Sequence, residues 1–172
     1  MDRLWSPWRY RYVSSGLQPE ECVFCAKPRE SDRDGLILVR GRHNFVLLNL
    51  YPYTTGHLMV VPYAHLANLE DLPEETAVEM LALARRAVRS LKRVYRPEGL
   101  NVGLNLGQCA GAGIADHLHL HVLPRWTGDA NFLSTIGETR VLPEDLGETW
   151  RKLSAAFHEP AAEQSPAPHS GV

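Results

Sequence analysis

The sequence has few cysteines, no long apolar run and almost no excess of charge of either sign. Three cysteines among 172 residues are too few for a disulfide framework. No apolar stretch approaches the roughly 20 residues that cross a bilayer, and no signal-peptide core is visible near the start, so we expect a cytoplasmic protein that binds no membrane. A formal net charge of -2 at pH 7 gives no broad electrostatic footprint for long nucleic acids.

The sequence does have enough apolar residues for one ordinary domain. Hydrophobic residues make up 44% of the chain and charged residues 22%, and this length supports a single core. We expect that domain to span residues 22–158. Residues 1–21 are aromatic and basic without a clear period, which predicts an arm. Residues 159–172 are rich in Pro, Ala and Ser, which predicts a disordered tail.

Short apolar runs predict antiparallel strands. Three runs, at residues 36–40, 44–50 and 57–62, are separated by turn-rich segments, and this pattern indicates consecutive antiparallel strands. The alternating stretch 100–107 predicts another strand. A further strand is expected to carry the sequence HLHLHV, residues 117–122.

Helical periodicity predicts two helices. The longer one is expected to begin after Asp71, which would act as the cap with Glu74 three residues later, and to end at Pro97. The shorter one is expected over residues 143–157. The apolar stripe of the longer helix comprises Ala77, Met80, Leu81, Ala84, Val88, Leu91 and Tyr95.

Three histidines at alternate positions are the most informative feature of the sequence. In a strand, residues two apart share a face and lie about 6.5 to 7 Å apart along it. His117, His119 and His121 therefore project together. The intervening apolar side chains would be buried on the opposite face. A solvated strand face rarely has such a uniform row, so the row indicates chemistry.

Two chemistries compete for this row. A neutral imidazole can attack phosphorus and form a phosphoramidate that is readily displaced. Alternatively, His-x-His is a spacing found in zinc sites that activate water. The preceding loop, residues 107–113, contains three glycines, and such loops bring backbone N–H groups close to phosphate oxygens. This loop favours phosphorus chemistry.

The motif HLHLHVLPRW resembles the signature of the histidine triad (HIT) superfamily of nucleotidyl hydrolases and transferases. The resemblance extends through FVLLN, YPYTTGHLMVVP and GLNLG, which occur in the family's order. It implies an α+β fold of the HIT-like type, with a mainly antiparallel five-stranded sheet, one long helix and one or more short helices. It also implies a homodimer that acts on adenine nucleotides or dinucleoside polyphosphates.

The resemblance implies roles for individual residues. His119 would attack the α-phosphate and form a nucleotidyl-histidine intermediate, and His121 would bind phosphate oxygens. His57 matches a histidine buried near the triad, although a satisfied core histidine is an equal alternative. The remaining implied nucleotide-binding residues are Asn49 for ribose, Asn105 for phosphate, and the loop glycines Gly111 and Gly113. A turn asparagine and a polar strand surface are the alternatives for the two amides.

Cys22 and Cys25 have a spacing typical of structural zinc, but such a site needs two more ligands. Many bacterial members of the family resemble this chain in that pair, and the resemblance implies His65 and His117 as the other ligands of a structural Zn²⁺. No organic cofactor is expected. The alternatives are a redox dithiol, which would favour a helix N-terminus that the sequence does not suggest, and two idle thiols.

The arm and the segment after the triad resemble bacterial diadenosine polyphosphate phosphorylases of the family. Many members have a glutamine shortly before the triad, whereas here Gly113 and Ile114 occupy that region. The missing side chain would leave room for inorganic phosphate, rather than water, as the second acceptor. A non-catalytic nucleotide sensor, a purine nucleoside phosphoramidase and a zinc-dependent scaffold remain alternatives.

Overall fold

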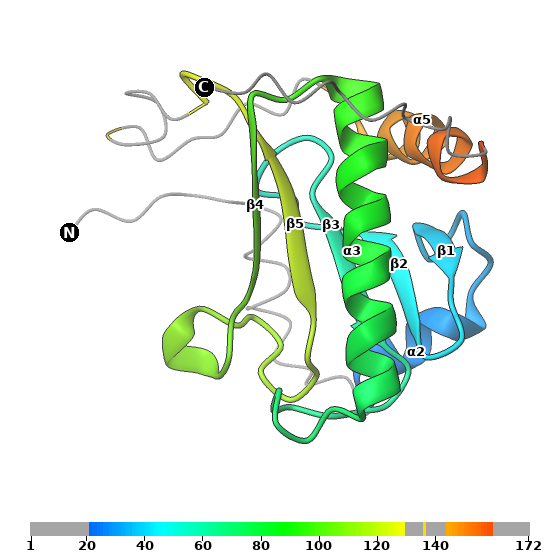
Figure 1. Cartoon of the computed structure of the whole chain (residues 1–172), viewed down its shortest axis with the longest axis vertical. Helices are drawn as coiled ribbons and strands as arrows, with labels where there is room; N and C mark the ends of the chain where they lie inside the picture. Colours follow the sequence, from blue (N-terminus) through cyan, green and yellow to red (C-terminus); the bar gives the residue numbers. More distant parts are fainter. Residues whose placement is uncertain (1–20, 130–135, 137–143, 160–172) are drawn as a thin grey trace, which may run out of the picture.

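The computed structural model describes residues 21–129, 136 and 144–159, so nearly all of the expected arm and tail lie outside the described residues. The described chain contains one five-stranded sheet in the order β1-β2-β3-β5-β4, and every neighbouring pair is antiparallel (Figure 1). The strands are β1 (Ile37–Arg40), β2 (Asn44–Leu48), β3 (Leu58–Pro62), β4 (Gly99–Leu104) and β5 (Leu120–Arg125). The predicted α+β class and five-stranded antiparallel sheet are confirmed.

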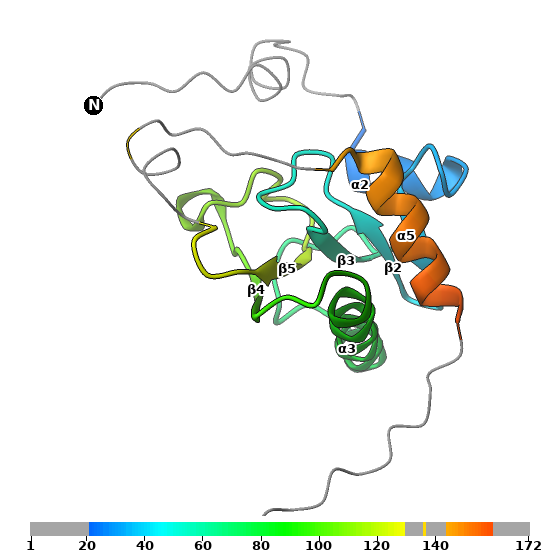
Figure 2. The same ribbon diagram turned by 90° about the horizontal axis from the view of Figure 1, so that it is seen from above.

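Helices cover both sides of this sheet. The long helix α3 (Glu74–Tyr95) packs on one face, and α2 (Val23–Ala26) lies on the opposite side (Figure 2). Helix α5 (Leu146–His158) packs against α3 and β1. Two 3₁₀ turns, η1 (Lys27–Arg29) and η2 (Gln108–Ala110), complete the described elements. None of the described helices is long and apolar enough to cross a membrane.

Helix α3 differs from its prediction in two details. Asp71 does not cap it, because the helix begins after Pro73 and the Asp71 carboxylate instead accepts a hydrogen bond from Asn68. Leu81 was expected in the core but is 61% exposed. Leu83 is buried in its place, because the helix is rotated so that the sheet covers only one side of a broad apolar stripe.

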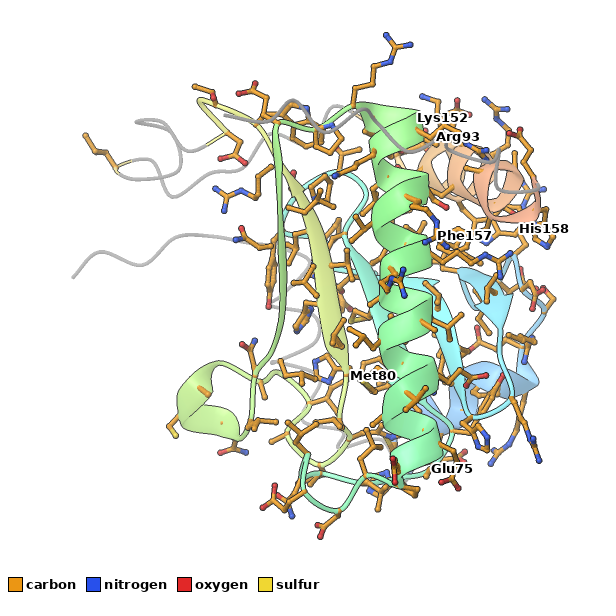
Figure 3. All side chains as sticks on the ribbon, in the orientation of Figure 1. Glu75, Met80, Arg93, Lys152, Phe157 and His158 are labelled. Atoms are coloured by element: carbon orange, nitrogen blue, oxygen red, sulfur yellow. The ribbon has the colours of Figure 1, made fainter. Side chains whose placement is uncertain are left out.

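Arginines of α3 hold the C-terminal end of α5 (Figure 3). Arg93 donates to the carbonyl oxygen of Ala156 at 2.5 Å, and Arg86 donates to that of Phe157. The last carbonyls of a helix have no partner within the helix, so these bonds satisfy groups that would otherwise need water. At the other side of α5, Trp150 donates its indole N–H to the Ile37 carbonyl oxygen of β1 at 2.9 Å.

The two faces of the sheet have separate cores. The helix-side core contains side chains from all three central strands, α3 and α5, including Val46, Val60 and Leu91. The opposite core is smaller and consists of Phe24, Ile37, Phe45, Leu47, Met59 and Val61. The histidine row adjoins this smaller core, because the rings of His117 and His119 lie against Phe24.

Candidate active site

The three triad histidines straddle the start of β5. His121 lies in the strand opposite Met59, whereas His117 and His119 precede it. The expectation that the whole row lies in a regular strand is therefore wrong, because the Leu118 N–H bonds to the Leu66 carbonyl in a loop and not to β3. The predicted alternation nevertheless holds. All three imidazoles are at most 6% exposed, and the intervening residues Leu118, Leu120 and Val122 belong to the helix-side core.

The backbone fixes which nitrogen of His119 carries the proton. Its Nδ1 lies 2.8 Å from the carbonyl oxygen of His117, and a carbonyl can only accept, so Nδ1 donates. Nε2 is then unprotonated. It has no hydrogen-bond partner among the described residues. Because it is not among the fully buried atoms that lack a partner, part of its surface is exposed to solvent. Burial lowers the pKa of His119, which keeps this nitrogen available as a nucleophile.

A chain of hydrogen bonds also fixes which nitrogen of His121 carries the proton. The Tyr53 backbone N–H donates to His57 Nδ1 at 3.1 Å, so the His57 proton must sit on Nε2. That nitrogen lies 2.8 Å from His121 Nδ1 and donates to it. His121 therefore carries its own proton on Nε2, which is buried and has no hydrogen-bond partner among the described residues. We call the residues Tyr53, His57 and His121 the relay group.

The Nε2–H of His121, at the end of the relay group, indicates a binding site for a ligand that accepts a hydrogen bond. A buried polar atom without a partner is costly in a folded protein, and His121 Nε2–H is such a donor. The rings of His119 and His121 are 4.8 Å apart. Burial, followed by the proximity of His119, lowers the pKa of His121 to about 4. The site thus places an unprotonated ring nitrogen beside a neutral N–H donor.

The structure gives the two expected amides different surroundings. Asn49 follows β2; its Oδ1 accepts from the Tyr51 N–H at 2.9 Å and its Nδ2 lies 3.3 Å from His57 Nδ1. This is the turn role, and contact with ribose stays a prediction. Asn105 follows β4 and is half-buried. Its Nδ2 lies 4.0 Å from where a Cβ on Gly111 would stand, so the two are neighbours.

The glycine loop is shaped by backbone angles that other residues rarely adopt. Gly107 and Gly111 have φ angles of 83° and 93°, which favour glycine. Gly113 lies in open space, where an added Cβ would meet nothing within 4 Å. Phosphate binding by this loop stays a prediction.

The four predicted metal ligands come together at one point. The ligand atoms of Cys22, Cys25, His65 and His117, which we call the metal group, all lie within 4.8 Å of one another. Three of the four sulfur to Nδ1 distances are 3.3 to 3.6 Å, and the two Nδ1 atoms are 3.3 Å apart. A tetrahedral zinc site with ordinary bond lengths has edges of about 3.3 Å between nitrogens and about 3.6 Å between nitrogen and sulfur.

The protonation of His117 also suits a metal. Its Nε2 donates to the carbonyl oxygen of Pro62 at 2.9 Å, which leaves Nδ1 as a lone-pair donor facing the thiols. The donor set therefore fits zinc. Val23 begins a one-turn helix directly after Cys22, so the expectation of no helix N-terminus there was wrong. Burial and the Cys22 thiol nevertheless raise the pKa of Cys25, whereas reactive dithiols have lowered values.

Two residues at the site escaped the sequence interpretation. Phe24 lies between the two cysteines, and its ring centroid is 5.4 Å from that of His117 and 5.0 Å from that of His119. Tyr53 contributes its backbone N–H to the relay group and its ring lies 4.6 Å from His57. The only signal for Phe24 in the sequence was an apolar residue enclosed by a ligand pair.

Comparison with known proteins agrees with this geometry. The chain matches the HIT domain over residues 31–128. An AP-4-A phosphorylase from Mycobacterium tuberculosis is 45% identical over 166 residues, covering 91% of this chain and 85% of the relative. A zinc-bound histidine triad family protein from Mycobacterium smegmatis is 32% identical, with a TM-score of 0.63 over 80% of this chain and 93% of that chain. A hypothetical histidine triad nucleotide-binding protein from Sulfolobus tokodaii is 25% identical, with a TM-score of 0.64 over 79% of this chain and 91% of that chain.

The domain match and the M. tuberculosis relative each cover more than half of the sequence. The solved structures share the fold over most of their own length. This chain belongs to the histidine triad (HIT) family.

Proposed function

We propose that this protein cleaves diadenosine tetraphosphate by transferring an adenylyl group to His119 and then to inorganic phosphate. The observation that carries the proposal is that two neighbouring histidines present ring nitrogens in opposite protonation states. His119 Nε2 is unprotonated, and beside it the buried Nε2–H of His121 has no hydrogen-bond partner within the described part of the chain. The naming of the M. tuberculosis relative as an AP-4-A phosphorylase supports this substrate class.

The reaction consists of two displacements at phosphorus. In the first, His119 Nε2 forms a bond to an α-phosphorus of the substrate, the bond to the bridging oxygen breaks, and ATP leaves. In the second, an oxygen of inorganic phosphate displaces the histidine and ADP leaves. The His121 N–H donates to a phosphate oxygen on which charge accumulates, and the carbonyl of His117 stabilises the positive charge that His119 acquires.

The choice of acceptor depends on the space before the triad. Gly113 is exposed and an added Cβ would meet nothing within 4 Å, so a phosphate ion would not meet a side chain at this position. Asn105 and Gly111 would contact the transferred phosphate from the loop side, and Asn49 would reach the ribose. The acceptor enters as a whole phosphate ion, which needs more room than water.

The metal group would hold a structural Zn²⁺ through Cys22, Cys25, His65 and His117. When bound, the ion joins three chain segments that are far apart in sequence and takes no part in the displacements. The M. smegmatis relative is described as zinc-bound, and that supports this assignment. The chemistry at phosphorus remains the work of imidazoles.

A second copy of the chain would cover the free edge of the sheet. Strand β4 is an edge strand, and its Val102 is 48% exposed. Leu81 on α3 is 61% exposed and lies about 140° around the helix from Arg86, which faces α5. This apolar flank and edge favour a homodimer. Sedimentation should give twice the chain mass, and Val102→Asp should yield the single-chain mass.

The test is to identify the products formed from diadenosine tetraphosphate with and without inorganic phosphate. With phosphate we expect ADP and ATP in equal amounts, and brief incubation followed by denaturation should trap one adenylyl group per chain. His119→Ala should form no adduct and lower turnover by roughly a thousandfold or more. AMP and ATP as the only products would exclude phosphorolysis, and an absence of any turnover would exclude the enzyme.

A further variant tests the acceptor. Gly113→Gln restores an amide before the triad and should lower the ratio of ADP to AMP, because the side chain reduces the space for phosphate but not for water. Ala115→Gln places the same side chain two residues further on, at a half-buried position, and provides the matched control. Equal product ratios in Gly113→Gln and the wild type would contradict the proposed role of this space.

A further inference from the structure

The segment that carries the nucleophile is weakly held by regular structure. His119 lies just before β5, which begins at Leu120. The segment instead depends on contacts with the end of β3 and with the loop that follows it. Leu118 donates its N–H to the Leu66 carbonyl oxygen, and the His117 ring donates to that of Pro62. These bonds hold the backbone, whereas the His119 ring has one hydrogen bond to the described residues, through Nδ1.

A single hydrogen bond fixes the tautomer of a ring but not the tilt of its plane. A nucleophile must be aligned with the bond that it breaks, and small errors in orientation lower the rate. The ring of His119 therefore needs a second contact from the side. His121 provides one such contact, with ring centroids 4.8 Å apart, and Phe24 provides another, with its ring centroid 5.0 Å away and the planes inclined by 46°.

Phe24 is itself fixed by its neighbours in the sequence. It is 5% exposed and forms part of the smaller core. It is flanked by Cys22, which directly precedes α2, and by Cys25 within α2, and their sulfurs lie 3.3 and 3.6 Å from His117 Nδ1. The metal group thus anchors both ends of the turn that presents Phe24. A second ring contact, to His117, ties it to the same group.

We propose that Phe24 is a positioning residue for His119, and that the metal group acts on catalysis by holding this ring against the nucleophile. The inference rests on the proposed function, because it concerns the nucleophile of that reaction. It adds a catalytic consequence to a site that would otherwise only stabilise the fold. Phe24 does not touch the substrate and acts entirely through the orientation of His119.

The first experiment compares Phe24→Leu with Phe45→Leu. Both replace a buried aromatic ring of the smaller core by an aliphatic side chain, but Phe45 stacks on Tyr63, 5.2 Å away, instead of a triad histidine. In single-turnover reactions with diadenosine tetraphosphate, adenylyl-histidine formation should slow about tenfold in Phe24→Leu, with little change in the substrate concentration at half-maximal rate. Phe45→Leu should stay within twofold of the wild type at a similar loss of thermal stability.

The second experiment observes His119 without any substrate. Nitrogen-15 NMR of the imidazole side chains in zinc-loaded protein should show a fixed Nδ1–H tautomer in the wild type and in Phe45→Leu. In Phe24→Leu the His119 ring signals should broaden as the ring plane gains freedom about its hydrogen bond, while zinc content stays at one per chain. Stripping zinc from the wild type with a chelator should broaden the same signals.

Two further variants test the proposal if Phe24→Leu folds poorly. Phe24→Tyr keeps the ring and should keep wild-type His119 signals, whereas Phe24→Met fills the space with a flexible chain and should not. Unchanged rates and unchanged His119 signals in both Phe24→Leu and Phe24→Met would overturn the proposal. A wild type that forms no adenylyl-histidine would instead refute the proposed function, and the NMR comparison would still decide the role of Phe24.

Discussion

The metal group and the relay group use the same side chain in opposite ways. In the metal group, Nδ1 atoms of His65 and His117 converge with two sulfurs on one point. In the relay group, His57 and His121 form a chain of hydrogen bonds that begins at a backbone N–H and ends at a donor with no partner among the residues that the structure describes. His119 stands between the two groups, in ring contact with His121.

The difference shows that the backbone assigns the role of each imidazole. The Pro62 carbonyl oxygen accepts a hydrogen bond from His117 Nε2–H, so the lone pair of Nδ1 faces the thiols. The His117 carbonyl oxygen accepts a hydrogen bond from His119 Nδ1–H, so the lone pair is on Nε2. A backbone N–H starts the relay group and sets the tautomers of His57 and His121. A metal site such as the metal group requires only suitable ligand atoms, whereas a chain of hydrogen bonds such as the relay group requires one particular tautomer at each histidine.

The largest expected effect is on stability and comes from the metal group. Cys25→Ala removes one of the four proposed ligands, and the free energy of unfolding should fall by several kcal/mol because metal binding is coupled to folding. Urea unfolding of zinc-loaded protein measures it, and a chelator should reduce the wild type to a similar midpoint. Cys109→Ala changes an exposed cysteine outside the group and should leave the midpoint unaltered. Equal midpoints for all three proteins would show that the group does not stabilise the fold.

The next effect is on rate and comes from the relay group. His57→Leu removes the donor to His121 Nδ1, so the proton on the far nitrogen is no longer fixed. Adenylyl transfer should slow by about a hundredfold, the lower end of what a positioned proton donor contributes. His57→Gln can still donate through its amide and should recover part of the rate. If Leu and Gln at this position gave the same rate, the tautomer argument would be wrong.

Sequence alone predicted the parts of this comparison that depend on local periodicity. The alternation of His117, His119 and His121 with apolar residues indicated a shared face, and the structure keeps it. The stripe of α3 was found but drawn too broadly, since periodicity does not tell which flank the sheet covers. Leu81 is the residue that this ambiguity misplaced.

The parts that depend on distant contacts could not be predicted from spacing. His57 and His121 are 64 positions apart, and the donor that orders them is a backbone N–H, which every residue has. The cysteine pair signalled a metal, but its histidine partners came only from the family resemblance. Nothing in the letters CVFC says that the enclosed phenylalanine contacts His119.

A smaller effect is expected from acid. Burial, and then the proximity of His119, lowers the pKa of His121 from 6.5 to about 4. Between these two pH values the unfolded chain binds a proton at this residue that the folded chain does not bind. The free energy of unfolding should therefore decrease as the pH falls from about 6.5 towards 4. His57, Tyr53 and His119 are the groups that face this ring.

The measurement compares the wild type with His121→Gln by urea unfolding at several pH values in that window. Contributions from the metal ligands are common to both proteins and cancel in the difference. The variant should lose less stability on acidification, because it lacks the buried imidazole. Parallel curves would mean that His121 does not hold its proton affinity down in the folded state.

The smallest effect should follow an exchange within the metal group. His65 is exposed and comes from the loop after β3, and zinc accepts three cysteines with one histidine as readily as two with two. His65→Cys should therefore keep one zinc per chain and a turnover within about threefold of the wild type, whereas His65→Ala should lower zinc content. Zinc content is measured by mass spectrometry and turnover from ADP release. Because only convergence matters in this group, the swap is tolerated. A hundredfold loss of turnover in His65→Cys with zinc retained would mean that ligand identity, and not convergence alone, sets the geometry transmitted to His119.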